Sequence, residues 1–213
     1  MTRPDGGVPL ALAVDIGRTK IAAGLVAADG TLAEHRRTAT PTGPEILGTV
    51  FELARPLMER AAVCGIGTAS TVDPQGRIAS ATDLLTGWAG TDAKGAAERT
   101  LALPTVVLND CHAAGAAGAR AGAARDARTA LVVAVGTGIG GAVCVEGRVR
   151  TGVSGTAGSI GHLPVLSRQR RRADRRRVRH CVVRRRRLAG PQHRRRLFDH
   201  RGPRRAEDRQ GAA

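Results

Sequence analysis

The sequence is poor in aromatic residues, with one Trp, two Phe and no Tyr among its 213 residues. A folded core must therefore be filled by closely packed aliphatic side chains. Long apolar runs are missing as well: the first run, at residues 10–14, is short and is followed by Asp15. Because a helix needs about 20 apolar residues to cross a bilayer, we expect neither a signal peptide nor a membrane span.

Paired cysteines are also lacking. The four Cys residues show neither a CxxC spacing nor the pattern of a disulfide framework. Cysteines without such patterns are typical of proteins in a reducing compartment. We therefore expect a cytoplasmic protein.

Excess charge is absent from most of the chain. The formal net charge is +16, but 19 of the 34 basic residues, all of them Arg, and only 4 of the 18 acidic residues come after residue 167. Residues 1–167 are left with a net charge of +1. Any electrostatic attraction to nucleic acid would therefore come from the tail alone.

The sequence does contain alternating strand and helix patterns. Short apolar runs predict strands, and apolar residues at helical spacing predict helices. The predicted strands cover residues 10–14, 21–26, 31–38, 63–68, 105–108, 131–135 and 142–145, and the predicted helices cover residues 44–62, 90–101 and 113–124.

This order of elements predicts an α/β domain with a mixed sheet that helices cover on both faces. A strand follows the glycine turn at Gly17, so this first turn is a hairpin and not the phosphate loop of a Rossmann fold. Pro56 lies inside the first predicted helix and should kink or split it.

Two glycine turns could approach a phosphate group. At the first, Gly17 permits a tight turn, Thr19 and Lys20 offer polar groups, and Asp15 could hold Mg²⁺ through water. The second turn, at residues 136–141, has four glycines, which allow the backbone to approach a ligand closely. Each pattern, taken alone, also fits a plain β-turn.

An Asn-Asp pair, Asn109 and Asp110, follows the predicted strand at residues 105–108. The carboxyl end of a strand in an open α/β sheet is where ligands bind. A carboxylate there can accept the proton of an attacking hydroxyl group during phosphoryl transfer. The competing interpretation is an Asx cap of the following helix, which the pair alone favours.

As a set, these segments resemble the ROK family (repressors, open reading frames, kinases) of sugar kinases, which includes glucokinases and N-acetylmannosamine kinases. The resemblance covers residues 8–166. It rests on residues 13–20, 65–68, 103–110, 136–141 and 155–162.

The resemblance implies an actin-like ATPase fold of two RNase H-like lobes, with ATP and a sugar in the cleft. Asp110 then matches the catalytic base, and His162 matches a residue that contacts the sugar and ligates a structural zinc. The two glycine turns match the loops that hold the phosphates of ATP and its Mg²⁺. The implied phosphate-loop residues are Asp15, Gly17, Thr19, Lys20, Gly136, Thr137, Gly138 and Gly140. The implied sugar-binding residues are Gly67, Asn109, Asp110, Ser159 and His162.

Two positions depart from the family pattern. Arg18 stands where most members have Gly, and its side chain could crowd the nucleotide or add a cation near phosphate. Ser159 stands where many members have a Glu that holds sugar hydroxyls. Because members that resemble N-acetylmannosamine kinases can lack this Glu, Ser159 favours N-acylamino sugars over glucose.

After residue 166 the family pattern stops. The zinc motif CxCGxxGC that should follow His162 is absent, and one His with Cys181 cannot form a four-ligand zinc site. We therefore expect residues 8–166 to form the N-terminal lobe of the kinase, with the second lobe missing.

Residues 167–213 are expected to be a non-native or disordered Arg-rich tail. A shifted reading frame explains the Arg runs best, because CGN codons read one base later encode Ala, Gly, Val or Asp. A disordered linker and a nucleic-acid-binding arm are the alternatives.

The predicted function is the ATP-dependent phosphorylation of a hexose or N-acylhexosamine, impaired where the second lobe is missing. The alternatives are a catalytically dead sugar-binding domain and a fragment of a ROK-type transcriptional regulator. The expected partners are the sugar and ATP. The resemblance implies a homodimer, and neither nucleic acid nor a membrane is expected as a partner.

Overall fold

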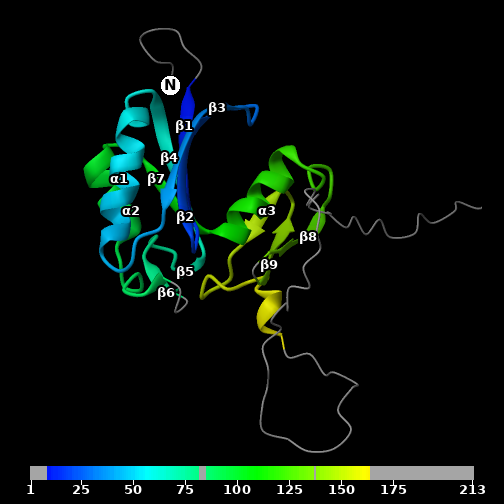
Figure 1. Ribbon diagram of the computed structural model, residues 1–213. Helices are drawn as coiled ribbons and strands as arrows, with labels where there is room; N and C mark the ends of the chain where they lie inside the picture. Colours follow the sequence, from blue (N-terminus) through cyan, green and yellow to red (C-terminus); the bar gives the residue numbers. More distant parts are fainter. Residues whose placement is uncertain (1–8, 82–84, 137, 164–213) are drawn as a thin grey trace, which may run out of the picture.

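The computed structural model describes residues 9–81, 85–136 and 138–163 (Figure 1). The elements in chain order are β1 (Leu10–Ile16), β2 (Lys20–Val26), β3 (Leu32–Ala39), α1 (Glu45–Met58), β4 (Ala61–Thr68), β5 (Ser70–Val72), β6 (Ile78–Ala81), α2 (Ala93–Leu101), β7 (Thr105–Asn109), α3 (Asp110–Ala121), β8 (Thr129–Val135), β9 (Ile139–Val145), β10 (Arg148–Arg150) and the 3₁₀ helix η2 (Ile160–His162).

The main sheet has five strands in the order β3-β2-β1-β4-β7. The first three strands form an antiparallel meander, and β4 and β7 run parallel to β1. The predicted mixed sheet and the predicted hairpin at Gly17 are therefore confirmed. Because β1, β4 and β7 are parallel, their carboxyl ends lie at the same edge of the sheet.

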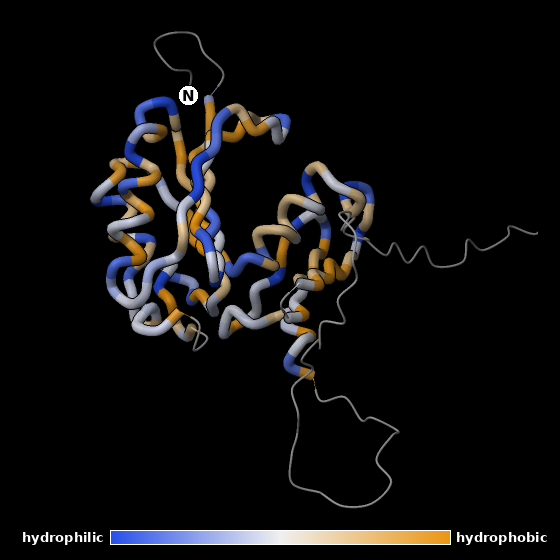
Figure 2. Tube along the Cα trace, viewed as in Figure 1, coloured by the Kyte–Doolittle hydropathy of each residue, from blue (hydrophilic) through white to orange (hydrophobic). Residues whose placement is uncertain are grey.

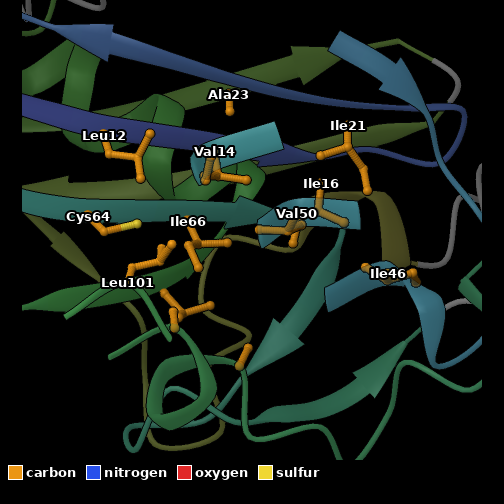
Figure 3. Close-up of a cluster of buried hydrophobic side chains, with 14 of the residues drawn as sticks. Leu12, Val14, Ile16, Ile21, Ala23, Ile46, Val50, Cys64, Ile66 and Leu101 are labelled. Atoms are coloured by element: carbon orange, nitrogen blue, oxygen red, sulfur yellow. The ribbon is translucent and has the colours of Figure 1, made fainter. Parts of the chain in front are cut away.

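One face of this sheet forms the main core. Alternate residues of β1 (Leu12, Val14 and Ile16) are at most 4% exposed, as a strand with one buried face requires. They pack with side chains of α1 and α2 (Figure 3). Figure 2 shows the apolar residues concentrated along these strands. Burial of each Leu or Ile side chain contributes about 1.5–3 kcal/mol.

The other face of the five-stranded sheet has no comparable helical cover in the described part of the chain. Figure 1 shows α1 and α2 together on one side of the sheet, and α3 contacts this sheet chiefly at β4 and β7. The sequence predicts helices on both faces, but among the described residues α3 contacts the second face only at the ends of β4 and β7, so most of that face is uncovered. The uncovered face carries small residues such as Ala13 and Gly65, and Val63 and Val106 on it remain 45% and 59% exposed.

A second, antiparallel sheet has the order β10-β9-β8. It packs against α3 around a small core of Ala119, Val132, Ala142 and Cys144. Strands β8 and β9 are antiparallel partners. A third sheet consists of β5 and β6 alone. The described part of residues 8–166, which the sequence predicts as one lobe, thus contains three separate sheets, and α3 contacts the five-stranded and the three-stranded sheet.

Helix α1 is shorter than predicted. It ends at Met58 because β4 already begins at Ala61, and Pro56 lies in its last turn without splitting it. Proline removes one N–H donor from the helix, and the helix ends two residues later. Among the described residues, no helix is long and apolar enough to cross a membrane.

Candidate functional site

The site is built around the aligned ends of β1, β4 and β7. Asp15 is the register partner of Gly67, and Thr68 is the partner of Asn109. Neighbouring strands lie about 4.8 Å apart, so these residues are close neighbours. A Cβ atom built on Gly67 would lie 3.9 Å from the Cα atom of Asp110. The structure thus brings four of the predicted site residues together.

The first glycine hairpin is fixed by a residue outside it. The Gly17 N–H donates to the Lys20 carbonyl oxygen at 3.0 Å. The Thr40 hydroxyl donates to the Gly17 carbonyl oxygen at 2.7 Å, and the Thr40 N–H donates to the Thr19 carbonyl oxygen at 3.2 Å. Sequence reasoning missed Thr40, whose role depends on a contact across 23 residues.

The tip of this hairpin can receive an anion. Arg18, Thr19 and Lys20 are all exposed. The backbone N–H groups of Arg18 and Thr19 have no hydrogen-bond acceptor among the described residues. Successive free N–H groups with cationic side chains beside them favour phosphate. The Gly17 N–H is already used within the hairpin and is not available in this arrangement.

Asn109 caps α3. Its Oδ1 atom accepts hydrogen bonds from the N–H groups of Cys111 at 3.0 Å and His112 at 3.3 Å. Its Nδ2 atom donates to the Ser70 carbonyl oxygen at 3.2 Å. The Asx-cap interpretation is thus confirmed for Asn109, and its contact with a sugar stays a prediction.

Asp110 is the first residue of α3 and is exposed. Its Oδ1 atom accepts a hydrogen bond from the Cys111 N–H at 2.8 Å. Its Oδ2 atom has no hydrogen-bond donor among the described residues. Asp110 therefore has an oxygen atom that can accept a proton from a bound hydroxyl group, which is the chemistry predicted for it.

A buried polar network supports this end of the sheet. Thr68 is fully buried, and its hydroxyl accepts a hydrogen bond from the Trp88 Nε1–H at 3.1 Å. The same hydroxyl donates to the Ser70 Oγ atom at 3.4 Å. Since the Ser70 carbonyl also holds Asn109, the network links the end of β4 to the cap of α3. No buried side-chain N or O atom in the described residues lacks a hydrogen-bond partner.

The second glycine turn is shorter than predicted. Strand β9 already begins at Ile139, so Gly140 and Gly141 are strand residues that pair with β8. Gly140 is a glycine because its backbone lies against the Cys111 Sγ atom, where a Cβ atom has no room. This contact places the second hairpin next to the first turn of α3.

The remaining loop of this hairpin spans residues 136–138. The Gly136 N–H donates to the Gly138 carbonyl oxygen at 2.9 Å, and both glycines are exposed. Thr137 lies outside the described residues. Phosphate binding by Gly136, Thr137, Gly138 and Gly140 stays a prediction.

Ser159 and His162 lie on a segment that we call the substrate segment, residues 151–162. Ser159 precedes η2 and is half-buried, and His162 ends η2 and is exposed. The His162 N–H donates to the Ser159 carbonyl oxygen at 3.1 Å, so the two predicted sugar-binding residues share one turn. The segment is attached to α3 through His112, whose Nε2 atom lies 2.8 Å from the Ala157 carbonyl oxygen.

The two expected metals fit the described residues differently. No group of three or more His, Cys, Asp or Glu side chains that could hold a metal is present among them, so a zinc site at His162 does not fit this part of the chain. Cys181 lies outside the described residues. Mg²⁺ fits better, because the exposed carboxylate of Asp15 lies at the edge of the sheet that carries the first glycine hairpin.

A pocket of about 380 Å³ runs along the free edge of β7. The β5–β6 turn and the start of the substrate segment form its walls, and Asn109 and His112 line its end near α3. Its volume is within the range of small-ligand sites, about 300–1,000 Å³. Gly67, Asp110, Ser159 and His162 do not line it.

Comparison with known proteins identifies relatives of this fold and site. The chain is 35% identical over 162 residues to a glucokinase from Streptomyces coelicolor, covering 74% of this chain and 50% of that protein. It is 34% identical over 154 residues to an N-acetylmannosamine kinase from Escherichia coli O1:K1, covering 71% and 53%. The chain therefore spans about half the length of these relatives.

The likeness extends to three dimensions. A crystal structure of a ROK family glucokinase from Streptomyces griseus in complex with glucose and AMPPNP matches with a TM-score of 0.67 and 33% identity. The match covers 74% of this chain and 51% of that one. The family model of the ROK family matches residues 11–182. From the α/β fold, the aligned strand ends and these matches together, the chain belongs to the ROK family and is a homologue of its sugar kinases.

Proposed function

We propose that this protein transfers the γ-phosphate of ATP to a hydroxyl group of a hexose or N-acylhexosamine. The observation that supports this most directly is the position of Asp110. It is exposed beside Gly67, at the edge of the sheet that also carries Asp15 and the first glycine hairpin. A base and a hairpin that can hold phosphate are two recurring parts of phosphoryl-transfer sites.

In the proposed reaction, the Oδ2 atom of Asp110 accepts the proton of the attacking sugar hydroxyl. The sugar oxygen forms a bond to the γ-phosphorus, the bond from that phosphorus to the β–γ bridging oxygen breaks, and ADP leaves with the electron pair. A positioned base of this kind contributes about 10²- to 10⁴-fold to the rate.

The phosphates of ATP are proposed to lie between the two hairpins. The Arg18 and Thr19 N–H groups and the Lys20 ammonium would hold them on one side, and residues 136–138 on the other. Mg²⁺, held through water by the Asp15 carboxylate, would supply positive charge to offset the charge of the phosphates.

Arg37 is a further cation on the proposed phosphate side. It is the register partner of Ala22, which is itself the partner of Asp15, so the three residues lie in one row across the uncovered face. Arg36 pairs with the buried Ala23 and faces the other way, where it bonds the Glu34 carboxylate at 3.4 Å. Of these two arginines, Arg37 is therefore the one placed to attract a bound phosphate.

The described residues are suited to bind the phosphates of ATP more than its adenine. The aromatic residues among them are Trp88, which is 1% exposed, and Phe51, which packs against the core. Neither offers an exposed ring for an adenine to stack on. We therefore propose that the described residues contribute phosphate contacts and the sugar side of the reaction.

A kinase assay on the full chain tests this proposal. Glucose, N-acetylglucosamine and N-acetylmannosamine are each supplied with ATP, and the phosphorylated sugar is detected directly. We expect transfer, with N-acylhexosamines preferred because Ser159 replaces an acidic residue. Sugar binding without any transfer, and without change in the Asp110→Asn variant, would favour a sugar-binding domain instead.

A further inference from the structure

His112 is a titratable side chain that the proposed reaction does not use, and it is buried, with 3% exposure. It lies in the first turn of α3, two residues after Asp110. Its Nε2 atom is 2.8 Å from the Ala157 carbonyl oxygen. Because a carbonyl oxygen can only accept a hydrogen bond, Nε2 carries the hydrogen and donates it.

This bond joins α3 to a segment whose glycines also contact β5 and β9. Gly155, at φ +71°, lies against the Val72 carbonyl oxygen of β5. Gly158, at φ +83°, lies close to β9, where an added Cβ atom would be 3.0 Å from the Gly141 carbonyl oxygen. At these two points only a glycine fits both the backbone conformation and the space. The segment thus bridges β5 and β9.

The hydrogen bond from His112 to the Ala157 carbonyl oxygen, which we call the tether, lies between the two halves of the proposed sugar site. On one side, Asp110 belongs to the same helical turn as His112. On the other side, Ser159 and His162 follow Ala157 within one short stretch that includes η2. A change in the length or presence of the hydrogen bond would therefore move Ser159 and His162 relative to Asp110. Misplacement of reacting groups by about 1 Å can reduce a rate by about 10²-fold.

The pocket along β7 depends on the same bond. His112 and Asn109 line its end, and Thr151, Gly152 and Gly155 of the substrate segment line its wall. With the His112 bond in place, the wall and the end of the pocket are held together. Without it, the segment would retain its backbone contacts at the glycines but lose its side-chain bond to α3.

We propose that His112 is a positioning residue, which fixes the substrate segment against the first turn of α3 and so sets the positions of Ser159 and His162. The tether itself is independent of the reaction, whereas its effect on sugar binding rests on the proposed function. His112 acts through its hydrogen bond and not only by filling space. A variant that keeps the donor must therefore differ from one that keeps only the volume.

The test compares His112→Gln, whose amide nitrogen can still donate, with His112→Phe, which fills the space without a donor. His35→Phe, at an exposed position of β3, controls for a new phenyl ring elsewhere. Amide hydrogen exchange of the full chain is measured at residues 151–162 and, as an internal reference, at β1. Affinities for the sugar and for AMPPNP are measured on the same samples.

We expect His112→Phe to speed exchange in residues 151–162 by about tenfold while exchange in β1 stays the same. We expect His112→Gln to remain within about threefold of the wild type. Sugar affinity should fall about tenfold in the Phe variant alone, with AMPPNP affinity unchanged. Equal exchange in the wild type and both variants, or equal acceleration in both variants, overturns the proposal. If the wild type binds no sugar, the proposed function fails, whereas the exchange result still decides the tether.

Discussion

A Cβ atom built on Gly67 would lie 3.9 Å from the Cα atom of Asp110, so the end of β4 passes directly beside the first residue of α3. This contact brings the proposed base to the edge where Asp15 and the first hairpin lie. It also explains why a small residue occupies position 67, because any side chain there projects into the space in front of Asp110.

Gly67→Ala should therefore weaken sugar binding without unfolding the protein. Its methyl group would make ordinary contacts of 3.8–3.9 Å with Ala113, Val14 and Asp110. Alanine also restricts the unfolded chain, which stabilises a compatible strand by about 0.4–1 kcal/mol. We expect about tenfold weaker sugar binding in calorimetry and an unchanged or higher melting temperature. Gly65→Ala, on the same face with no atom within 4 Å of its Cβ, is the matched control and should bind normally.

Gly140→Ala should destabilise the fold through one steric overlap, with the Cys111 Sγ atom. Its Cβ atom would overlap the Cys111 Sγ atom, while the Cys111 Cβ atom, at 3.7 Å, leaves enough room. Overpacking of this kind costs about 1–3 kcal/mol. In the Cys111→Ala background the same substitution should cost less than about 0.5 kcal/mol. Urea unfolding of the four proteins of this double-mutant cycle measures the coupling, and additive losses would contradict the packing account.

Arg37→Gln should weaken the binding of AMPPNP, because Arg37 shares a face and a row with Asp15. We expect about a three- to tenfold loss at low salt, which corresponds to about 0.6–1.4 kcal/mol. Arg36→Gln removes the same charge on the opposite face and should have a smaller effect. The difference should shrink at high ionic strength, since salt screens exposed charges. Equal losses in both variants would show that only overall charge matters.

The Cys64 thiol should make the free energy of unfolding depend on pH in the alkaline range. Burial raises the pKa of its thiol from 9.0 to about 11. The unfolded chain therefore loses this proton near pH 9, whereas the folded chain keeps it until about pH 11. The contribution of the protonated Cys64 thiol to the free energy of unfolding is fully present below pH 9 and is lost as the pH rises through 11.

Cys64→Val removes this titration while keeping an apolar side chain of similar size. Between about pH 8 and pH 11 the wild type should lose about 2–3 kcal/mol more stability than the variant. Denaturant unfolding across this range measures the difference, and parallel curves for the two proteins would refute the assignment to Cys64.

Much of the fold could be predicted from local sequence signals. The short apolar runs at residues 10–14 and 21–26, with the Gly17 turn between them, predict a hairpin and exclude a Rossmann turn. The apolar run at residues 105–108, followed by Asn109 and Asp110, is enough to place Asp110 at the end of a strand. These features depend on residues close together in the chain, where periodicity and turn chemistry are informative.

Other parts of the site depend on contacts between distant residues. The bond from His112 to Ala157 spans 45 residues, and the bond from Thr40 to Gly17 spans 23. No periodicity marks either residue, so the sequence alone could not reveal them. The second glycine turn was predicted too long because Gly140 and Gly141 weaken a strand pattern, although both lie in β9.

Several expectations stay predictions. The tail at residues 167–213, its suggested origin in a shifted reading frame and any ligand role of Cys181 lie outside the described residues. The homodimer, the absence of a nucleic-acid partner and the preference for N-acylamino sugars are likewise not tested by the fold. The uncovered face of the five-stranded sheet was not foreseen, because an α/β pattern does not tell which face each helix covers.

The most direct test of the account is the transfer of the ATP γ-phosphate to sugar by the full chain carrying Asp110→Asn. We expect transfer to fall about 10²- to 10⁴-fold, because the amide cannot accept the hydroxyl proton. Sugar affinity should stay within about threefold, and the loss of the Asp110 charge at the start of α3 should cost at most about 1 kcal/mol. Asp126→Asn, at an exposed position in the turn after α3, should transfer at the wild-type rate. Transfer by Asp110→Asn at the wild-type rate would contradict the account.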